Sequence, residues 1–155
     1  MLVYRIAKSE RRINDISGTG AFKEGGRWNN PGTYMLYTSE NSSLAYLENL
    51  VHFEPENTPP NLYIMGIDLK IKDALIYTLP DKDYPKGWQK IGNLENKDLG
   101  DQFMDELKFL AIKVRSAINT IEYNYLLNPL FPGYHDLVKI HIIEKLNVDA
   151  RLVKL

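Results

Sequence analysis

The sequence predicts a single α+β domain, and three observations lead to this fold class. Strand-like segments outnumber helical ones, only two segments carry the periodicity of a main helix, and no internal repeat, low-complexity stretch or linker divides the chain. A length of 155 residues suits one domain. A domain of this size buries roughly two-thirds of its unfolded surface, so neither a metal nor a disulfide is needed to hold it together.

The first third of the chain is expected to form two strands around a glycine-rich loop. Residues 2–7 are apolar and strand-like, and the polar run at 8–12 is a poor continuation on a buried face. Residues 18–32 hold five glycines and are expected to be a loop of about 15 residues. Long ordered loops are usually functional. Residues 33–38 (TYMLYT) are aromatic and β-branched, which indicates the second strand.

A first main helix is expected from about residue 41 to residue 53. Polar residues between 39 and 43 offer candidate N-caps. The apolar residues on one face at helical spacing are Leu44, Leu47, Leu50 and Val51. Prolines end this helix, and they are Pro55, Pro59 and Pro60.

The remainder of the chain is expected to be mostly strand, with one further main helix. Strands are expected at 62–69 and 74–77, and shorter strand-like pieces at 113–119, 137–143 and 150–153. The second main helix is expected over residues 99–112, because apolar residues recur there at helical intervals. Those residues are Phe103, Leu107, Leu110 and Ala111.

Composition excludes several function classes. With 19 basic and 20 acidic side chains the net charge is −1, so nucleic-acid binding has no electrostatic support. The chain has no cysteine, which excludes disulfides, thiolate nucleophiles and cysteine zinc sites. No signal-peptide pattern and no apolar run of the length of a membrane span is present. We therefore expect a cytoplasmic protein without a membrane partner.

Two familiar kinds of site are not indicated. Gly18-Thr19-Gly20 starts like a dinucleotide fingerprint, but Lys23 stands in place of the third glycine, and no strand directly precedes it. The three histidines, His52, His135 and His141, have no metal-ligand spacing. No metal is expected.

The informative segment runs from residue 25 to residue 52. It places Arg27 in a glycine-rich loop, Tyr37 at a strand end and Glu48 on the following helix, all within 21 residues. Each has an ordinary structural reading: packing for the tyrosine, a solvated loop for the arginine and a helix surface for the glutamate. Periodicity alone leaves the function undecided.

The order of residues resembles the RES family, named for its arginine, glutamate and serine, and the resemblance covers nearly the whole chain. The matching positions are Tyr4-Arg5-Ile6, Gly25-Gly26-Arg27-Trp28-Asn29 with Pro31-Gly32, Tyr37-Thr38, Ala45-Tyr46-Leu47-Glu48 with Val51-His52, Gly100-Asp101, Arg115-Ser116-Ala117, and Asn124-Tyr125-Leu126-Leu127-Asn128-Pro129. The chain departs from the family pattern at Phe103, where a tryptophan is usual, at Arg115, where a proline is common, and at Leu130-Phe131-Pro132, which replaces a His-Pro pair. These departures bear on packing around the site more than on its chemistry.

The resemblance implies a fold like that of ADP-ribosyltransferases and an attack on NAD. In that reading Glu48 stabilises the cationic ribose of the transition state, Arg5 and Arg27 bind phosphate, and the Tyr37 ring holds nicotinamide. Ser116 and Asn128 would position ribose or carboxamide. The structural alternatives are an ion-paired strand-end arginine for Arg5 and turn chemistry for Ser116 and Asn128. Trp28 is expected to be structural.

Three functions stay open at this point. The first is an NAD glycohydrolase or phosphorolase that acts as the toxin of a toxin–antitoxin pair. The second is a protein ADP-ribosyltransferase with the same NAD pocket, and the third is a catalytically silent binding module. For a toxin, the resemblance implies a helix-turn-helix antitoxin of the Xre type as partner, and it is compatible with a homodimer inside that complex. NAD would be the substrate, with no metal.

Overall fold

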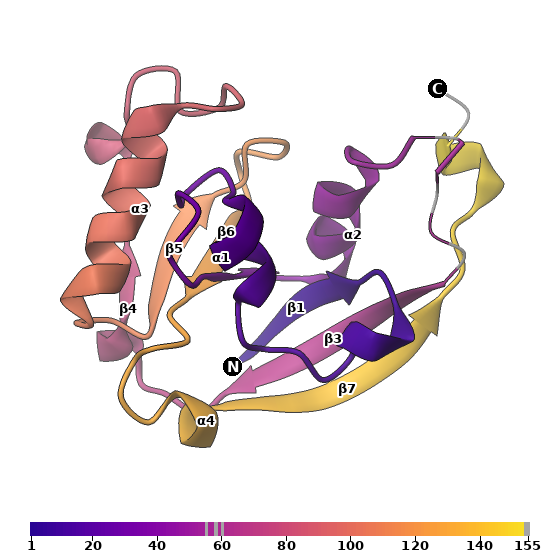
Figure 1. The fold of residues 1–155 in the computed structure, drawn as a ribbon, viewed down its shortest axis with the longest axis horizontal. Helices are drawn as coiled ribbons and strands as arrows, with labels where there is room; N and C mark the ends of the chain where they lie inside the picture. Colours follow the sequence, from indigo (N-terminus) through magenta and orange to yellow (C-terminus); the bar gives the residue numbers. More distant parts are fainter. Residues whose placement is uncertain (55, 58, 60, 154–155) are drawn as a thin grey trace.

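The described chain folds around one mixed β-sheet flanked by short helices (Figure 1). The computed structural model describes residues 1–54, 56–57, 59 and 61–153, so Pro55 and Pro60 of the predicted helix end lie outside the described residues. The strands in chain order are β1 Leu2–Ala7, β2 Leu36–Ser39, β3 Leu62–Leu69, β4 Ile76–Thr78, β5 Ala111–Arg115, β6 Tyr123–Leu127 and β7 Val138–Leu146. The α-helices are α1 Thr19–Glu24, α2 Ser42–Leu50, α3 Leu94–Glu106 and α4 Tyr134–Leu137. The α+β class predicted from the sequence, with α2 and α3 as its two main helices, is confirmed.

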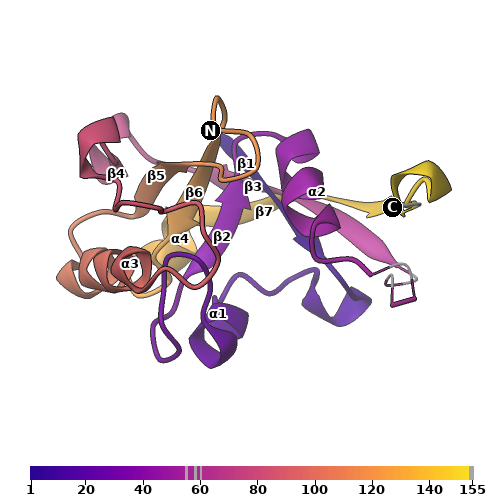
Figure 2. The same ribbon diagram turned by 90° about the horizontal axis from the view of Figure 1, so that it is seen from above.

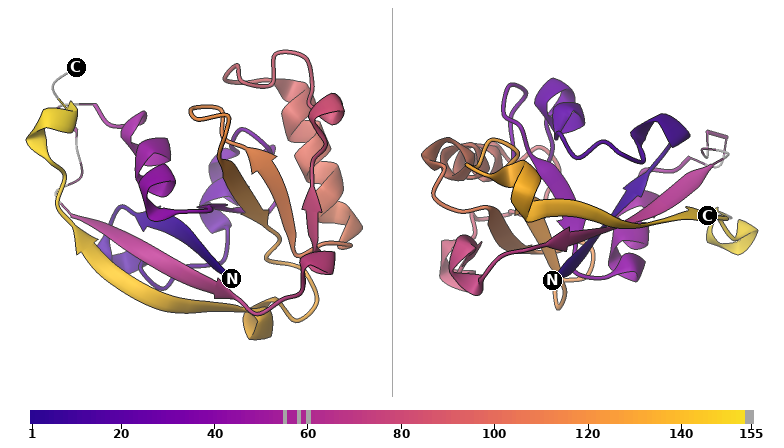
Figure 3. Two further views of the ribbon diagram at one scale, coloured as in Figure 1. Left: turned by 180° about the vertical axis from the view of Figure 1, so that it is seen from behind. Right: turned by 90° about the horizontal axis from the view of Figure 1, so that it is seen from below.

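The sheet has the order β4-β5-β6-β2-β1-β3-β7. Its neighbours are antiparallel except for the β4–β5 pair. The long strands β3 and β7 form a curved ribbon along one edge (Figure 3). Next to them β1 pairs fully with β3, but with β2 only at Tyr4 and Ser39. The sheet therefore opens between β1 and β2 beyond this one contact.

The two main helices lie over opposite halves of the sheet, α3 beside β4 and β5 and α2 beside β1 (Figures 1 and 2). The side chains under α3 include Trp28, Met35, Met104 and Leu126, all buried. A separate cluster under α2 joins Ala45 to strand residues of β1 and β3. A third and larger cluster joins buried residues of β1, β2, β3, β5, β6 and β7, so it continues through both halves of the sheet. The opening between β1 and β2 lies where the halves meet.

Several predicted elements are confirmed almost to the residue. Strands at 2–7 and 62–69 are β1 and β3. The helix predicted from about residue 41 is α2, capped by the Asn41 side chain, which accepts from the Leu44 amide at 2.8 Å. The predicted apolar face of this helix was wrong in part, because Leu47 and Val51 are 37% and 58% exposed. The helix packs through Leu44 and Ala45 instead.

Other predicted boundaries were wrong for identifiable reasons. The second helix runs from 94 to 106 rather than from 99 to 112, because Asn93 caps it and the left-handed Leu107 ends it. The apolar residues after 107 recur at helical spacing, yet 111–115 pair with β6 as a strand. Residues 150–153 form a 3-10 turn instead of a strand, with the Asp149 carboxylate accepting from the Arg151 amide.

The glycine-rich region contains structure that the sequence did not indicate. Helix α1 occupies residues 19–24 inside the predicted loop. Its Phe22 ring stacks on Tyr34 at 4.3 Å between centroids, and the strand predicted from residue 33 begins only at Leu36. Strand β6 and helix α4 were also missed. The predicted strand at 74–77 is a 3-10 turn followed by β4. The one at 113–119 was wrong after residue 115, where β5 ends, and the one at 137–143 lies in β7 except for its first residue.

Candidate active site

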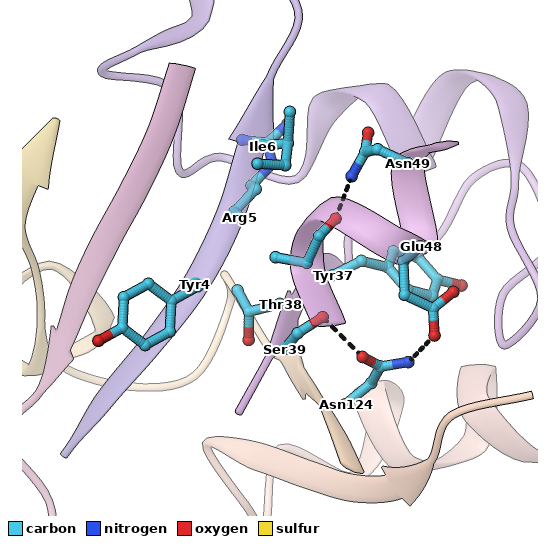
Figure 4. A pocket seen from close by; sticks show the side chains of 10 residues that line it. Tyr4, Arg5, Ile6, Tyr37, Thr38, Ser39, Glu48, Asn49 and Asn124 are labelled. Carbon is cyan, nitrogen blue, oxygen red and sulfur yellow. Dashed lines mark hydrogen bonds between the residues drawn. The ribbon is translucent and has the colours of Figure 1, made fainter. Parts of the chain in front are cut away.

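Two adjoining hollows open where β1 and β2 separate. The first, called here the acidic hollow, has a cavity volume of about 80 Å³. Its lining residues are Tyr4, Arg5, Ile6, Tyr37, Thr38, Ser39, Ala45, Glu48, Asn49 and Asn124 (Figure 4). The second, called the basic hollow, has about 210 Å³ and is lined by Arg5, Ile6, Lys8, Arg12, Tyr37 and Asn49. The shared residues Arg5, Ile6, Tyr37 and Asn49 make the two hollows neighbours.

Glu48 is the carboxylate of the acidic hollow, and one of its oxygens is held by two donors. The Ser116 hydroxyl donates to Oε1 at 2.7 Å, and the Asn124 amide donates to the same oxygen at 2.6 Å. The Ser116 oxygen itself accepts from the backbone amides of Ile118 and Asn119 at 3.1 Å, so its single proton is directed at Glu48. Within the described residues Oε2 has no hydrogen bond, which leaves it available to a ligand.

Asn124 is in turn oriented by β2. It lies directly opposite Ser39 in the β2–β6 ladder. The Ser39 hydroxyl donates to the Asn124 carbonyl oxygen Oδ1 at 2.7 Å, while the amide NH₂ faces the Glu48 carboxylate (Figure 4). Three side chains from β2, β6 and α2 therefore form one hydrogen-bonded chain at the pocket wall.

The basic hollow gathers three cations from a short stretch of sequence. Arg5 comes from β1, and Lys8 and Arg12 come from the turn after this strand. The Arg5 guanidinium donates to the backbone carbonyl of Asp15, which is a different contact from the ion pair with a carboxylate that was its structural alternative. Burial lowers the pKa of Arg5, with Asp15 acting against the shift, but a guanidinium stays charged at neutral pH. The hollow suits an anion.

Tyr37 lines both hollows, and its hydroxyl is already engaged. It donates to Asn29 Oδ1 at 2.8 Å and accepts from the Trp28 amide at 2.9 Å. Burial raises the pKa of Tyr37 well above its usual range, and the hydrogen bond from Trp28 opposes this only in part. The hydroxyl thus stays protonated and fixes the loop at 26–29, while the ring faces the pocket.

Arg27 is not among the residues that line the two hollows. Its Nη1 points at a turn of backbone, with the carbonyl oxygens of Trp88, Gln89 and Lys90 at 3.2, 2.8 and 3.4 Å. The guanidinium therefore anchors the 88–90 segment. Its phosphate-binding role, predicted from the resemblance, has no counterpart in the pocket geometry.

Glycines explain how the loop around Arg27 is packed. A Cβ on Gly26 would lie 2.5 Å from the Tyr37 hydroxyl oxygen, and one on Gly100 would lie 1.7 Å from the Trp28 carbonyl oxygen. Next to Gly100, Asp101 accepts from both the backbone and the side-chain nitrogen of Asn30. The Gly25–Asn29 and Gly100-Asp101 motifs thus meet in space and support the wall of the pocket.

Asn128 and Trp28 have structural surroundings. The Asn128 side chain is 1% exposed, donates to the Met104 carbonyl and accepts from the Leu130 amide. These contacts correspond to the turn chemistry that was the alternative for Asn128, and they place it outside the pocket. Trp28 is 3% exposed and packs against Tyr84 and Trp88, in line with the structural part predicted for it.

Of the six predicted site residues, the structure therefore brings four together. Arg5, Tyr37 and Glu48 line the acidic hollow, and Ser116 donates a hydrogen bond to Glu48 without lining the hollow itself. Sequence reasoning missed Lys8, Arg12, Ser39 and Asn124. Asn124 belongs to the motif at residues 124–129, in which only Asn128 was predicted to be a site residue. The strand pairing that aims Asn124 at Glu48 has no local sequence signal.

Two further observations concern the described part of the chain. No three His, Asp or Glu side chains there come together as a metal site would require. No helix there is both long and apolar enough to cross a membrane.

Comparison with known proteins gives consistent matches over the whole chain. The family model described as RES domain matches residues 2–149. A protein named "Toxin Res" from Photorhabdus laumondii is 31% identical over 157 residues, covering 99% of this chain and 98% of the relative. A second "Toxin Res", from Pseudomonas putida, is 33% identical over 156 residues, with 98% and 99% covered. A "Prs ADP-ribosylating toxin" from Sphingobium sp. is 28% identical over 158 residues, with 97% and 96% covered.

A solved structure has the same fold. It is the crystal structure of the MbcT–MbcA toxin–antitoxin complex of M. tuberculosis, which matches with a TM-score of 0.71 at 16% identity and covers 94% of this chain and 83% of that one. At this identity the likeness establishes the fold.

Proposed function

The chain belongs to the RES domain family, and we propose that it is a toxin that consumes NAD by breaking the bond between nicotinamide and ribose. Relatives that are matched over nearly their full length carry the name "Toxin Res", which supports the toxin part of the proposal. The NAD part is supported by the resemblance and by the pocket.

The observation that carries the reaction is the carboxylate of Glu48 with one oxygen fixed and the other open to the hollow. Loss of neutral nicotinamide from NAD builds positive charge on the ribose, as in glycoside cleavage. A carboxylate that is already oriented stabilises this charge without reorganisation when it develops. In the proposed complex, Oε2 accepts a ribose hydroxyl and lies beside the oxocarbenium-like carbon.

The basic hollow supports a dinucleotide rather than a simple nucleoside as substrate. A dinucleotide would occupy both hollows, with the pyrophosphate near Arg5, Lys8 and Arg12 and the nicotinamide ribose near Glu48. The Tyr37 ring, which lines both hollows, would then lie against the nicotinamide end.

Transfer of ADP-ribose to a protein is the second candidate, because one relative is named "Prs ADP-ribosylating toxin". Both candidates need the same bond to break, and they differ in whether water, phosphate or a protein side chain takes the ribose. The pocket favours none of these acceptors, so the assay has to distinguish them.

The test is to incubate the purified chain with NAD, with and without inorganic phosphate, and with and without bacterial lysate. Chromatography resolves nicotinamide, ADP-ribose and ADP-ribose-1″-phosphate, and labelled NAD reports transfer to protein. Nicotinamide release in any arm supports the proposal, and the second product identifies the acceptor. No release in any arm would leave the silent binding module as the better reading and would overturn the NAD-consuming function.

The partner that we propose is a small antitoxin of the helix-turn-helix Xre type, which would block access to the hollows. Expression of this chain alone should then arrest growth and lower cellular NAD, and co-expression with the product of the adjacent gene should restore both. Soluble, folded protein that accumulates without either effect would contradict the toxin proposal. A measurement of the mass of the complex in solution would give the oligomeric state of the toxin within it.

A further inference from the structure

We propose that Asn124 is a positioning residue for Glu48, and that the hydroxyl of Ser39 supports the amide orientation on which this role depends. The catalytic meaning of this inference rests on the proposed function, but the arrangement of the three side chains does not. It consists of the Ser39 hydroxyl donating to Asn124 Oδ1 at 2.7 Å and the Asn124 NH₂ donating to Glu48 Oε1 at 2.6 Å.

The orientation of the amide decides whether Asn124 helps or hinders the carboxylate. With the NH₂ group toward Glu48 the contact is a charge-assisted hydrogen bond, whereas the reverse orientation would place the carbonyl oxygen against a negative charge. The carboxylate can only accept, so it favours the first orientation. Ser39 is 4% exposed and directly opposite Asn124 in the sheet, and its hydroxyl donates to the carbonyl oxygen that is then turned away from Glu48. The chain of donors thus runs from β2 through β6 to α2.

The two donors on Oε1 leave Oε2 as the oxygen that can meet the substrate. Ser116 approaches from the loop after β5 and Asn124 from β6, so the carboxylate is held from two separate elements. Loss of Asn124 alone would let the carboxylate rotate about its remaining contact with Ser116. Turnover should then fall while NAD affinity changes little, because none of the proposed phosphate-binding cations donates a hydrogen bond to Asn124 and two of them, Lys8 and Arg12, line only the other hollow.

The charges around Glu48 make a pH test interpretable. The titratable groups that line the acidic hollow with it are Tyr4 and Arg5 on β1 and Tyr37 on β2. The contacts from β6 and from the loop after β5 are the neutral amide and hydroxyl already described. A new carboxylate at position 124 would therefore face Glu48 directly, without a cation between them.

The experiment compares Asn124→Asp with a matched control, Asn41→Asp. Asn41 lies at the start of the same helix, and its NH₂ donates to Glu122 at 3.0 Å, so the control creates the same kind of carboxylate pair outside the two hollows. A pair of facing carboxylates holds a shared proton to higher pH. In Asn124→Asp the acid limb of the turnover profile should move up by more than about one pH unit, and in Asn41→Asp it should stay in place.

Two neutral variants keep the proposal testable if the charged one folds poorly. Asn124→Ala should lower turnover roughly tenfold to a hundredfold, since one charge-assisted hydrogen bond is lost. Ser39→Ala should lower it less, because the amide can still adopt the favourable orientation part of the time. Neither should raise the KM for NAD more than about twofold, as expected when only a transition-state interaction is lost.

A second readout separates this inference from the proposed function. The side-chain ¹³C resonance of Glu48, followed by NMR against pH, should titrate at higher pH in Asn124→Asp than in the wild type and should be unmoved in Asn41→Asp. If the wild type releases no nicotinamide, the NAD proposal fails while this titration still tests the contact. A Glu48 resonance and a pH profile that are both unchanged in Asn124→Asp would overturn the positioning role.

Discussion

Replacing Glu48 by glutamine separates the two parts of the proposed chemistry, binding and bond cleavage. The carbonyl oxygen of glutamine can still accept from Ser116 and Asn124, so the internal contacts at 2.7 and 2.6 Å keep their geometry. What changes is the group that faces the hollow, which becomes a neutral NH₂ in place of a carboxylate oxygen. The ground-state ribose is neutral and loses little, whereas the transition state loses its counter-charge.

The expected magnitudes follow from these contacts. Removing one preorganised electrostatic stabiliser commonly lowers turnover about a hundredfold to a thousandfold. The two internal hydrogen bonds lose their charge assistance, which costs on the order of 1 kcal/mol of folding free energy. For a chain of this length that corresponds to a decrease in Tm of about 2 to 4 °C. The variant should therefore be folded and should bind NAD, but it should cleave NAD slowly.

The assay pairs calorimetric NAD binding with nicotinamide release on the same preparations. Glu40→Gln is a suitable control, because Glu40 also accepts a hydrogen bond, from the Tyr123 amide at 2.8 Å, but does not line either hollow. Turnover in Glu40→Gln should match the wild type. Wild-type turnover in Glu48→Gln would refute the reasoning and require another group to stabilise the ribose.

Three further predictions concern the basic hollow, the buried tyrosine and the glycine packing. Arg12→Gln should raise the KM for NAD about tenfold at low salt and less at high salt. Arg11 is next to Arg12 but does not line the basic hollow, so Arg11→Gln should leave the KM unchanged. Equal effects of the two substitutions would argue against a phosphate site. Burial raises the pKa of Tyr37 above its unfolded value of about 10, so its contribution is present below that pH and is lost as pH rises further. Tyr37→Phe should accordingly show a smaller fall in unfolding free energy between about pH 9 and pH 11 than the wild type, measured by urea denaturation. Gly100→Ala should destabilise by more than about 3 kcal/mol because its Cβ would lie 1.7 Å from a carbonyl oxygen, whereas Gly20→Ala, also helical and with its nearest atom at 3.6 Å, should raise the Tm slightly.

The fold class could be predicted because apolar periodicity is local. The strands at 2–7 and 62–69 and the start of α2 were evident from neighbouring residues alone, although several polar residues were candidates for the cap that Asn41 provides. The end of α3 was not, since Leu107 to Ala111 satisfies helical spacing and strand character equally well. Residues 111–115 form a strand because they pair with β6, about 15 residues further along the chain.

The site was predictable in its chemistry but not in its arrangement. The resemblance to the RES family pointed to Arg5, Tyr37 and Glu48, and these converge at one opening. Arg27 has the right chemistry as well, but tertiary contacts direct its guanidinium to three backbone carbonyls. A sequence shows that a side chain can bind phosphate, and only the fold shows which acceptor it already has.

The location of the opening follows from how β2 pairs with its two neighbours. This strand pairs along its whole length with β6 but meets β1 at one position, so β1 diverges from it and leaves a wedge-shaped space. Helix α2 begins three residues after β2 ends, which places Glu48 over this space, while the ladder with β6 brings Asn124 to the same wall.

The charges of the two hollows match one kind of ligand. The basic hollow carries Arg5, Lys8 and Arg12, and the acidic hollow beside it carries the Glu48 carboxylate. A ligand with a permanent anion in its middle and a positive charge that passes from a pyridinium ring to the adjoining ribose meets both charges in the correct order. NAD has that distribution when the nicotinamide bond breaks, whereas a simple phosphate ester has only the anion. Under the proposed function, the carboxylate would repel such an ester at the site where it would stabilise the ribose of NAD, so the pair of hollows that would accelerate the reaction would also select its substrate.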